Sequence, residues 1–130
     1  MEQAGHTFRK QERICGKKDI ERLLQEGRYG HASCLRYCFL PENGASCNRI
    51  LVSVPKKYFK RAVRRNLLKR RIRESYRLRK TMLQGGHGID LLLIYNTKEL
   101  LGYSEISRAM ETVLTEVTDR VSKMEVQDGQ

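Results

Sequence analysis

The stretch KKYFKRAVRRNLLKRRIRESYRLRK, residues 56–80, holds thirteen lysines or arginines and a single acidic residue, Glu74. The whole chain of 130 residues has 26 basic and 15 acidic residues and a formal net charge of +11. The rest of the chain therefore holds 13 basic and 14 acidic residues, so the excess charge is local. Such a local concentration of cations is typical of a protein that holds a polyanion in a fixed orientation.

This stretch has no glycine or proline between Arg61 and Gln84, which predicts one helix of about 35 Å at 1.5 Å per residue. At 100° per residue, one arc of that helix carries cations and an amide, namely Asn66, Lys69, Arg70, Arg73 and Arg77. Another arc carries Leu68, Ile72, Ser75 and Tyr76. We therefore expect one stripe to pack on a sheet and a second stripe to face a ligand, with Arg65 on the boundary.

A run of cations is in most proteins only a solvated helix face. Here one acid among thirteen bases cannot neutralise the run from within, and like charges three or four residues apart repel by a few tenths of a kcal/mol per pair. A phosphate backbone would remove that repulsion. Asn66 among arginines suggests contact with a base edge or a 2′-hydroxyl. The pattern favours a nucleic acid and leaves RNA and DNA both open.

Two further helices are expected. Ile20, Leu23 and Leu24 recur at helical spacing and Gly27 follows, which predicts a short amphipathic helix ending at that glycine. Ser104 can cap a last helix, whose expected core stripe is Ile106, Met110, Val113, Leu114, Val117 and Val121. The final residues, MEVQDGQ, are expected to fray.

Three apolar segments predict strands. Residues 33–40 alternate, with Leu35, Tyr37 and Phe39 on one face. Residues 49–54 form a second, more central strand, and the turn residues before it suggest a hairpin. Residues 89–96, IDLLLIYN, are expected at the centre of the sheet. If the two segments before residue 55 divide into three strands, the order is α-β-β-β-α-β-α. This order describes an α+β two-layer sandwich with the helices on one side.

Length and composition fit one domain, residues 1–130, with an ordered core of about residues 8–122. No run approaches the roughly 18 apolar residues of a membrane span. The beginning, MEQAGHTFRK, lacks the apolar core of a signal peptide, so we expect a cytoplasmic protein.

Neither cysteines nor histidines show the spacing of a metal site or a catalytic dyad. The context is not that of a secreted, disulfide-rich chain, so free thiols are expected at Cys15, Cys34, Cys38 and Cys47. Loop positions are expected for His6, His31 and His87.

The string AVRRNLLKRRIR, residues 62–73, fits the pattern Ala-Val-x-Arg-Asn-x-x-Lys-Arg-x-x-Arg and resembles the signature of the bacterial ribonuclease P protein subunit. FRKQERICGKKDIERLLQEG looks like that family's N-terminal segment and first helix. VSVPKK and IDLLLIYN resemble the strands before and after the signature. The resemblance covers roughly residues 8–117.

The resemblance implies a ribonucleoprotein endonuclease that removes the 5′ leader from precursor tRNA. Its partners would be the catalytic RNA and the precursor tRNA, with no membrane and no small-molecule cofactor. The RNA subunit would hold the catalytic Mg²⁺, and the protein would bind no metal tightly and supply no catalytic residue. The implied fold is that of a ribosomal-protein-like domain with a left-handed β-α-β crossover, whereas the usual preference is right-handed.

The resemblance also implies functional residues. The RNA-contacting helix face would be Arg65, Asn66, Lys69, Arg70 and Arg73, and we add Arg77, Lys56 and Lys57. The family binds the single-stranded leader between its first helix, the sheet and the signature helix, and the matching positions here are Ile20, Leu24, Leu35 and Tyr37. Tyr37 could stack on a base, and an ordinary core position is the alternative for all four. Many relatives have phenylalanine in the first helix and Gly-Asn before Ala-Val, where this chain has Ile20, Leu24 and YFKR.

Two other functions remain open at this point. One is a ribosomal or RNA-chaperone protein of similar architecture without a processing role. The other is an amphipathic helix acting on anionic membranes, although the apolar stripe is narrow and is needed for the core.

Overall fold

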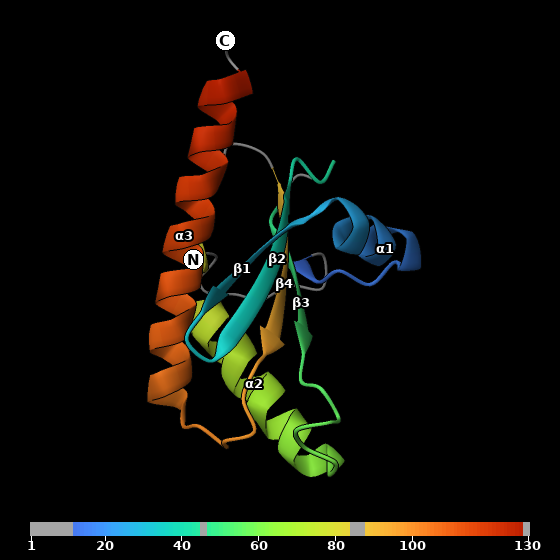
Figure 1. Cartoon of the computed structure of the whole chain (residues 1–130), viewed down its shortest axis with the longest axis vertical. Helices are drawn as coiled ribbons and strands as arrows, with labels where there is room; N and C mark the ends of the chain where they lie inside the picture. Colours follow the sequence, from blue (N-terminus) through green and yellow to red (C-terminus); the bar gives the residue numbers. More distant parts are fainter. Residues whose placement is uncertain (1–11, 45–46, 84–87, 129–130) are drawn as a thin grey trace, which may run out of the picture.

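The computed structural model describes residues 12–44, 47–83 and 88–128. Its elements are α1 (Lys17–Glu26), β1 (Arg28–Ala32), β2 (Leu35–Pro41), β3 (Arg49–Ser53), α2 (Ala62–Arg79), the 3-10 turn η3 (Lys80–Met82), β4 (Ile89–Tyr95) and α3 (Tyr103–Asp128). The predicted α+β class and element order are confirmed (Figure 1).

The four strands form one mixed sheet in the order β1-β2-β4-β3. β2 is antiparallel to both β1 and β4, and β3 is parallel to β4. β4 is therefore central, as predicted for its uniformly apolar sequence. The predicted hairpin between the second and third strands is wrong, because β4 lies between them and the chain reaches it from β3 through α2. The expectation that residues 49–54 form a more central strand is wrong as well, because β3 is at the edge.

The first hairpin, β1–β2, has a weak sequence signal. Ser33 makes its tight turn with a positive φ of 56°. Gly30 is needed because a Cβ there would lie 2.3 Å from the ring of Tyr37 on the neighbouring strand. His31, expected in a loop, lies in β1, whereas His6 and His87 fall outside the described residues.

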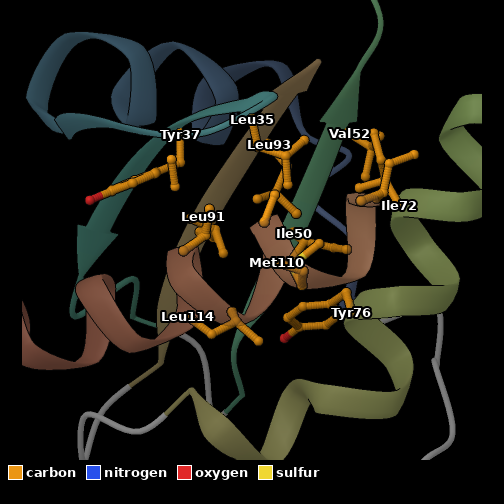
Figure 2. Close-up of a cluster of buried hydrophobic side chains, with 14 of the residues drawn as sticks. Leu35, Tyr37, Ile50, Val52, Ile72, Tyr76, Leu91, Leu93, Met110 and Leu114 are labelled. Atoms are coloured by element: carbon orange, nitrogen blue, oxygen red, sulfur yellow. The ribbon is translucent and has the colours of Figure 1, made fainter. Parts of the chain in front are cut away.

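Helices α2 and α3 cover one face of the sheet and enclose the main core with it (Figure 2). Every residue of the predicted α3 stripe is buried in that core. Helix α1 packs on the opposite face (Figure 1), where Leu23 belongs to a small buried cluster with Cys38, Leu40 and Leu92. The expectation that all helices lie on one side is therefore wrong for α1.

Helix boundaries differ from the predictions at three points. α2 ends at Arg79 and continues only as the 3-10 turn to Met82, so it is shorter than predicted. α3 begins at Tyr103, which places Ser104 inside the first turn instead of at the cap. α3 also continues to Asp128, so residues 124–128, expected to fray, are helical.

A buried polar cluster fixes α1 over the sheet. Asp90 on β4 is 1% exposed and accepts two hydrogen bonds from Arg49 on β3, at 2.8 and 2.9 Å, and one from Asn43 at 2.7 Å. Arg49 also pairs with Asp19 of α1 at 3.2 Å. A charged pair in the interior is tolerated only when such bonds satisfy it. Here the bonds join one helix to two strands.

In the described part of the chain, we find no helix whose length and apolar content would let it cross a membrane.

Candidate nucleic-acid interface

Helix α2 divides into the two predicted stripes. Its inward stripe is Leu68, Ile72, Ser75 and Tyr76, which are at most 1% exposed. The buried hydroxyl of Ser75 has a hydrogen-bond partner, because it donates to the carbonyl of Ile72 at 2.8 Å. The helix is thereby held against the sheet and α3 in one rotation, which turns the opposite stripe outward.

The outward stripe forms one wall of a groove of about 360 Å³. Its lining is Arg13, Asn66, Arg70, Arg73, Glu74 and Arg77, and we call it the arginine groove. The structure thus brings together four of the predicted RNA-binding residues and adds two that the sequence did not suggest. One of these, Arg13, comes from the segment that precedes α1 and bridges to Ile50 of β3.

The arginine groove holds four guanidinium groups and one carboxylate. Glu74 pairs with Arg77 at 2.6 Å, and this contact lowers the pKa of Glu74. Burial lowers the pKa of Arg73, and the neighbouring charge of Arg13 lowers it further. Four guanidinium groups against one carboxylate create a positive potential, so the groove is suited to an anion such as a phosphodiester.

Two predicted α2 residues, Arg65 and Lys69, are not part of the groove lining. Lys69 is half-buried on α2. Arg65 donates from Nη1 to the carbonyls of Phe59 and Lys60, both at 2.8 Å. Arg65 therefore shapes the turn into α2, in addition to any contact with RNA.

The same turn explains how YFKR replaces a glycine-containing connection. Phe59 is buried and packs against Tyr95, with ring centroids 5.9 Å apart. Lys56 and Lys57, also predicted to bind RNA, are exposed before it, and Lys57 lies 5.1 Å from the ring centroid of Tyr58. The exposed lysines thus lie in the connection between β3 and the N-terminal end of α2.

Several cations of residues 56–80 serve the fold. Arg71 donates to the carbonyl of Leu101 at 2.5 Å. Arg79 pairs with Glu111 of α3 at 3.0 Å, and Lys80 pairs with Glu12 at 2.7 Å. These acids come from elsewhere in the chain, so counting acids within the segment overestimated the cations left for a ligand.

The four predicted leader-cleft residues do not share one cleft. Ile20 and Leu24 lie on α1, and Leu24 is 46% exposed, so the alternative of a core position is wrong for it. Leu35 and Tyr37 are 0% and 1% exposed and point to the opposite face, into the core under α2 and α3 (Figure 2). Tyr37 donates to Glu116 of α3 at 2.7 Å. It is a core residue, because strand alternation directs it away from α1.

The strand register shows which side chains do face α1. Residues directly opposite in a ladder share a face, so Tyr29 joins Cys38, and His31 joins Arg36 and Ile94. We call Tyr29, His31, Arg36 and Ile94 the open row. Tyr29 is 41% exposed, and the guanidinium of Arg36 lies 5.5 Å from the centroid of its ring. Sequence reasoning missed the open row because it did not locate β1.

All four cysteines are free thiols, as predicted. Within residues 12–44, 47–83 and 88–128, no three His, Cys, Asp or Glu residues come together in a way that could hold a metal ion.

A mixed sheet that carries an arginine groove on one crossover helix and an open, partly aromatic row on its other face defines an α+β nucleic-acid-binding domain. The family model described as ribonuclease P matches residues 8–118. The chain belongs to the ribonuclease P protein family. The match includes the whole of α2 and so agrees with the resemblance of residues 62–73.

Relatives and solved structures agree with this assignment. The ribonuclease P protein component of Porphyromonas gingivalis (strain ATCC 33277) is 36% identical, with 86% of this chain and 87% of the relative covered. That of Dictyoglomus turgidum is 34% identical over 84% of this chain and 88% of the relative. The Staphylococcus aureus RNase P protein matches with a TM-score of 0.68 and 25% identity, over 79% of this chain and 92% of that one. The Thermotoga maritima RNase P protein, 24% identical with a TM-score of 0.69, shares the fold over 81% of this chain and 96% of that one.

Proposed function

We propose that this chain is the protein subunit of a bacterial ribonuclease P, which binds the catalytic RNA and the 5′ leader of precursor tRNA and assists removal of the leader. The observation that carries the proposal is the arginine groove, whose lining includes Asn66, Arg70 and Arg73 of the family signature. Cleavage and the catalytic Mg²⁺ belong to the RNA subunit, and the protein holds no metal tightly. The complex works in the bacterial cytoplasm.

The arginine groove and the exposed lysines before α2 bind RNA by charge. Each arginine or lysine that neutralises a phosphate releases condensed counterions, so affinity falls steeply with salt. Arg70 and Arg73 can hold a phosphate bidentately, and the amide of Asn66 can donate to and accept from the same nucleotide. This arrangement supplies affinity and orientation without any catalytic side chain.

The open row, with Ile20 and Leu24 of α1 beside it, is the surface we assign to the leader. A single strand is held by stacking its bases on rings and by pairing its phosphates with cations. Tyr29 supplies an exposed ring and Arg36 a cation within 5.5 Å of it. This surface replaces the one that Leu35 and Tyr37 were predicted to form.

The proposal is tested by adding the full chain to the ribonuclease P RNA encoded in the same genome. We expect the Mg²⁺ concentration needed for leader removal to fall, because protein cations replace metal ions in neutralising RNA phosphates. Cleavage that is unchanged by the protein, or equal affinity for ribosomal RNA fragments of the same length, would contradict it and favour a general RNA-binding role.

A variant links the effect to the groove. Arg70→Ala should weaken binding to the catalytic RNA by about 1 kcal/mol and lower the slope of log affinity against log salt by about one. The matched control is Arg108→Ala, at an exposed position on α3 outside the groove. Equal slopes for the two variants would remove Arg70 from the interface.

A further inference from the structure

Arg13 is held in place by contacts on both sides of it. The backbone N–H of Ile14 donates to the carbonyl of Ile50 at 3.0 Å, and Arg13 itself forms a parallel bridge with Ile50. On the other side, Glu12 pairs with Lys80 at 2.7 Å, and the two side chains are only 13% and 12% exposed. The segment before α1 is therefore fixed against both the edge strand β3 and the end of α2.

This placement brings the positive charge of Arg13 close to other arginines. Arg13 lines the same groove as Arg70 and Arg73, and its charge contributes to the lowered pKa of Arg73. Like charges brought together repel one another, most strongly where one of them, here Arg73, is partly buried. The one carboxylate of the groove, Glu74, is engaged with Arg77 at 2.6 Å. The residues that line the groove thus carry a net positive charge, which an anionic ligand would complement.

We propose that Arg13 and Arg73, which line the arginine groove from two different segments of the chain, grip one phosphodiester of bound RNA between them, so that Arg13 is an RNA-binding residue of this chain. A shared phosphate accepts from both guanidinium groups because its two non-bridging oxygens point in different directions. The segment before α1 thereby becomes part of the interface, although it lies outside the family's signature helix.

The groove fits a nucleotide better than a free anion. Asn66 lines it together with the arginines, and an amide both donates and accepts, which suits a 2′-hydroxyl or a base edge next to the phosphate. A volume of about 360 Å³ also exceeds what a single phosphate ion needs, since one water occupies about 30 Å³ of liquid. An RNA strand is therefore the occupant that uses the whole lining.

The inference rests on the proposed function and is tested with the same RNA. Arg13→Gln, Arg73→Gln and the double variant are compared for affinity to the catalytic RNA over a range of salt. If one phosphate is shared, each single variant should lose about fivefold to tenfold in affinity with little change in the salt slope. The double variant should lower the slope by about one, and at low salt its loss should exceed the product of the two single losses, because no cation then remains to neutralise the phosphate.

Separate phosphates give a different result. Each single variant would then lower the slope by about one and the double variant by about two, with multiplying losses, and sharing would be wrong. Arg13 would be excluded altogether if Arg13→Gln bound like the matched control Arg108→Gln. If the wild-type chain neither bound the RNA nor lowered the Mg²⁺ requirement, the proposed function itself would fail, which is distinguishable from an active wild type with an inert Arg13.

Two further readouts separate binding from folding and RNA from free anions. Thermal unfolding of Arg13→Gln is compared with that of the control Arg108→Gln, and a midpoint lowered in Arg13→Gln alone would assign Arg13 a structural role instead. Arg13→Lys, which keeps the charge, should recover part of the affinity. Inorganic phosphate should weaken RNA binding no more than chloride at equal ionic strength, and stronger competition that disappears in Arg13→Gln would make the groove a site for free phosphate.

Discussion

The two faces of the sheet are built from the same strands but covered to different extents. On the face under α2 and α3, Leu35, Leu91 and Leu93 are fully buried. On the other face, α1 covers Cys38 and Leu92, whereas the open row remains accessible at His31 and Arg36. Because side chains alternate along a strand, one residue of β2 or β4 contributes to the core and the next to a surface.

This difference assigns separate tasks to neighbouring residues. The covered face stabilises the fold and fixes the rotation of α2, and through it the arginine groove. The partly open face holds α1 by a small apolar cluster and a buried ion pair, and leaves a strip of sheet for a ligand. Substitutions at adjacent positions should therefore separate stability from RNA binding.

The largest effect is expected on the covered face of β4. Leu93→Ala removes a fully buried side chain and leaves a cavity, which should lower the free energy of unfolding by about 4 kcal/mol. Ile94→Ala, one residue further on and half-buried on the other face, is the control and should cost about 1 kcal/mol. Urea denaturation of the free protein measures both, and similar losses would show that the two faces contribute equally to stability.

A smaller loss is expected from the polar cluster that holds α1. Asp90→Asn removes the charge that pairs with Arg49, and Arg49 is then left mostly buried against a neutral amide. Hydrogen bonds between charged groups contribute about 1.5 to 3 kcal/mol, so we expect a loss near 2 kcal/mol. Hydrogen exchange of α1 amides should speed up relative to those of α2. Uniform acceleration in both helices would show that the cluster supports the whole fold and not α1 in particular.

Two tyrosines on adjacent strands give the next contrast. Tyr37→Phe removes the hydroxyl that bonds Glu116 at 2.7 Å and should destabilise the protein by about 1 kcal/mol without changing RNA affinity. Tyr29→Phe removes an exposed bond to the carbonyl of Leu24 at 3.2 Å and a hydrogen bond with the thiol of Cys38, and should cost less than about 0.5 kcal/mol. Thermal unfolding and RNA titration of both variants test this. Weaker RNA binding by Tyr37→Phe would indicate that Tyr37 contributes to the leader site after all.

The elements that could be predicted from the sequence are those whose signal is local. The stripes of α2 and α3 were predicted correctly because burial repeats at helical spacing, and β4 because its run is apolar on both faces. Pairing was not predictable in the same way. The parallel crossover that places β4 between β2 and β3 depends on contacts far apart in the sequence, and β1 carries the weak pattern Arg-Tyr-Gly-His-Ala.

The site followed the same rule. Asn66, Arg70, Arg73 and Arg77 were grouped correctly because one helix carries them all. Arg13 and the open row were missed because they come from other segments. Leu35 and Tyr37 were assigned to the cleft because the sequence does not tell which face of the strand lies toward α1. The strand register shows that both side chains face the core. RNA binding by these residues stays a prediction.

The smallest effect is expected in the open row. Arg36→Gln changes an exposed side chain, so stability should stay within about 0.5 kcal/mol of the wild type. If the row holds the leader, the assembled enzyme should lose about 0.5 to 1 kcal/mol of its preference for precursor over mature tRNA, because the cation beside Tyr29 is gone. Arg28→Gln is the matched control, since Arg28 is opposite Phe39 and so belongs to the other face of the same sheet. Binding of precursor tRNAs with and without a leader measures the difference, and equal losses in the two variants would mean that the leader is held elsewhere and that the open row, like the covered face, serves only the fold.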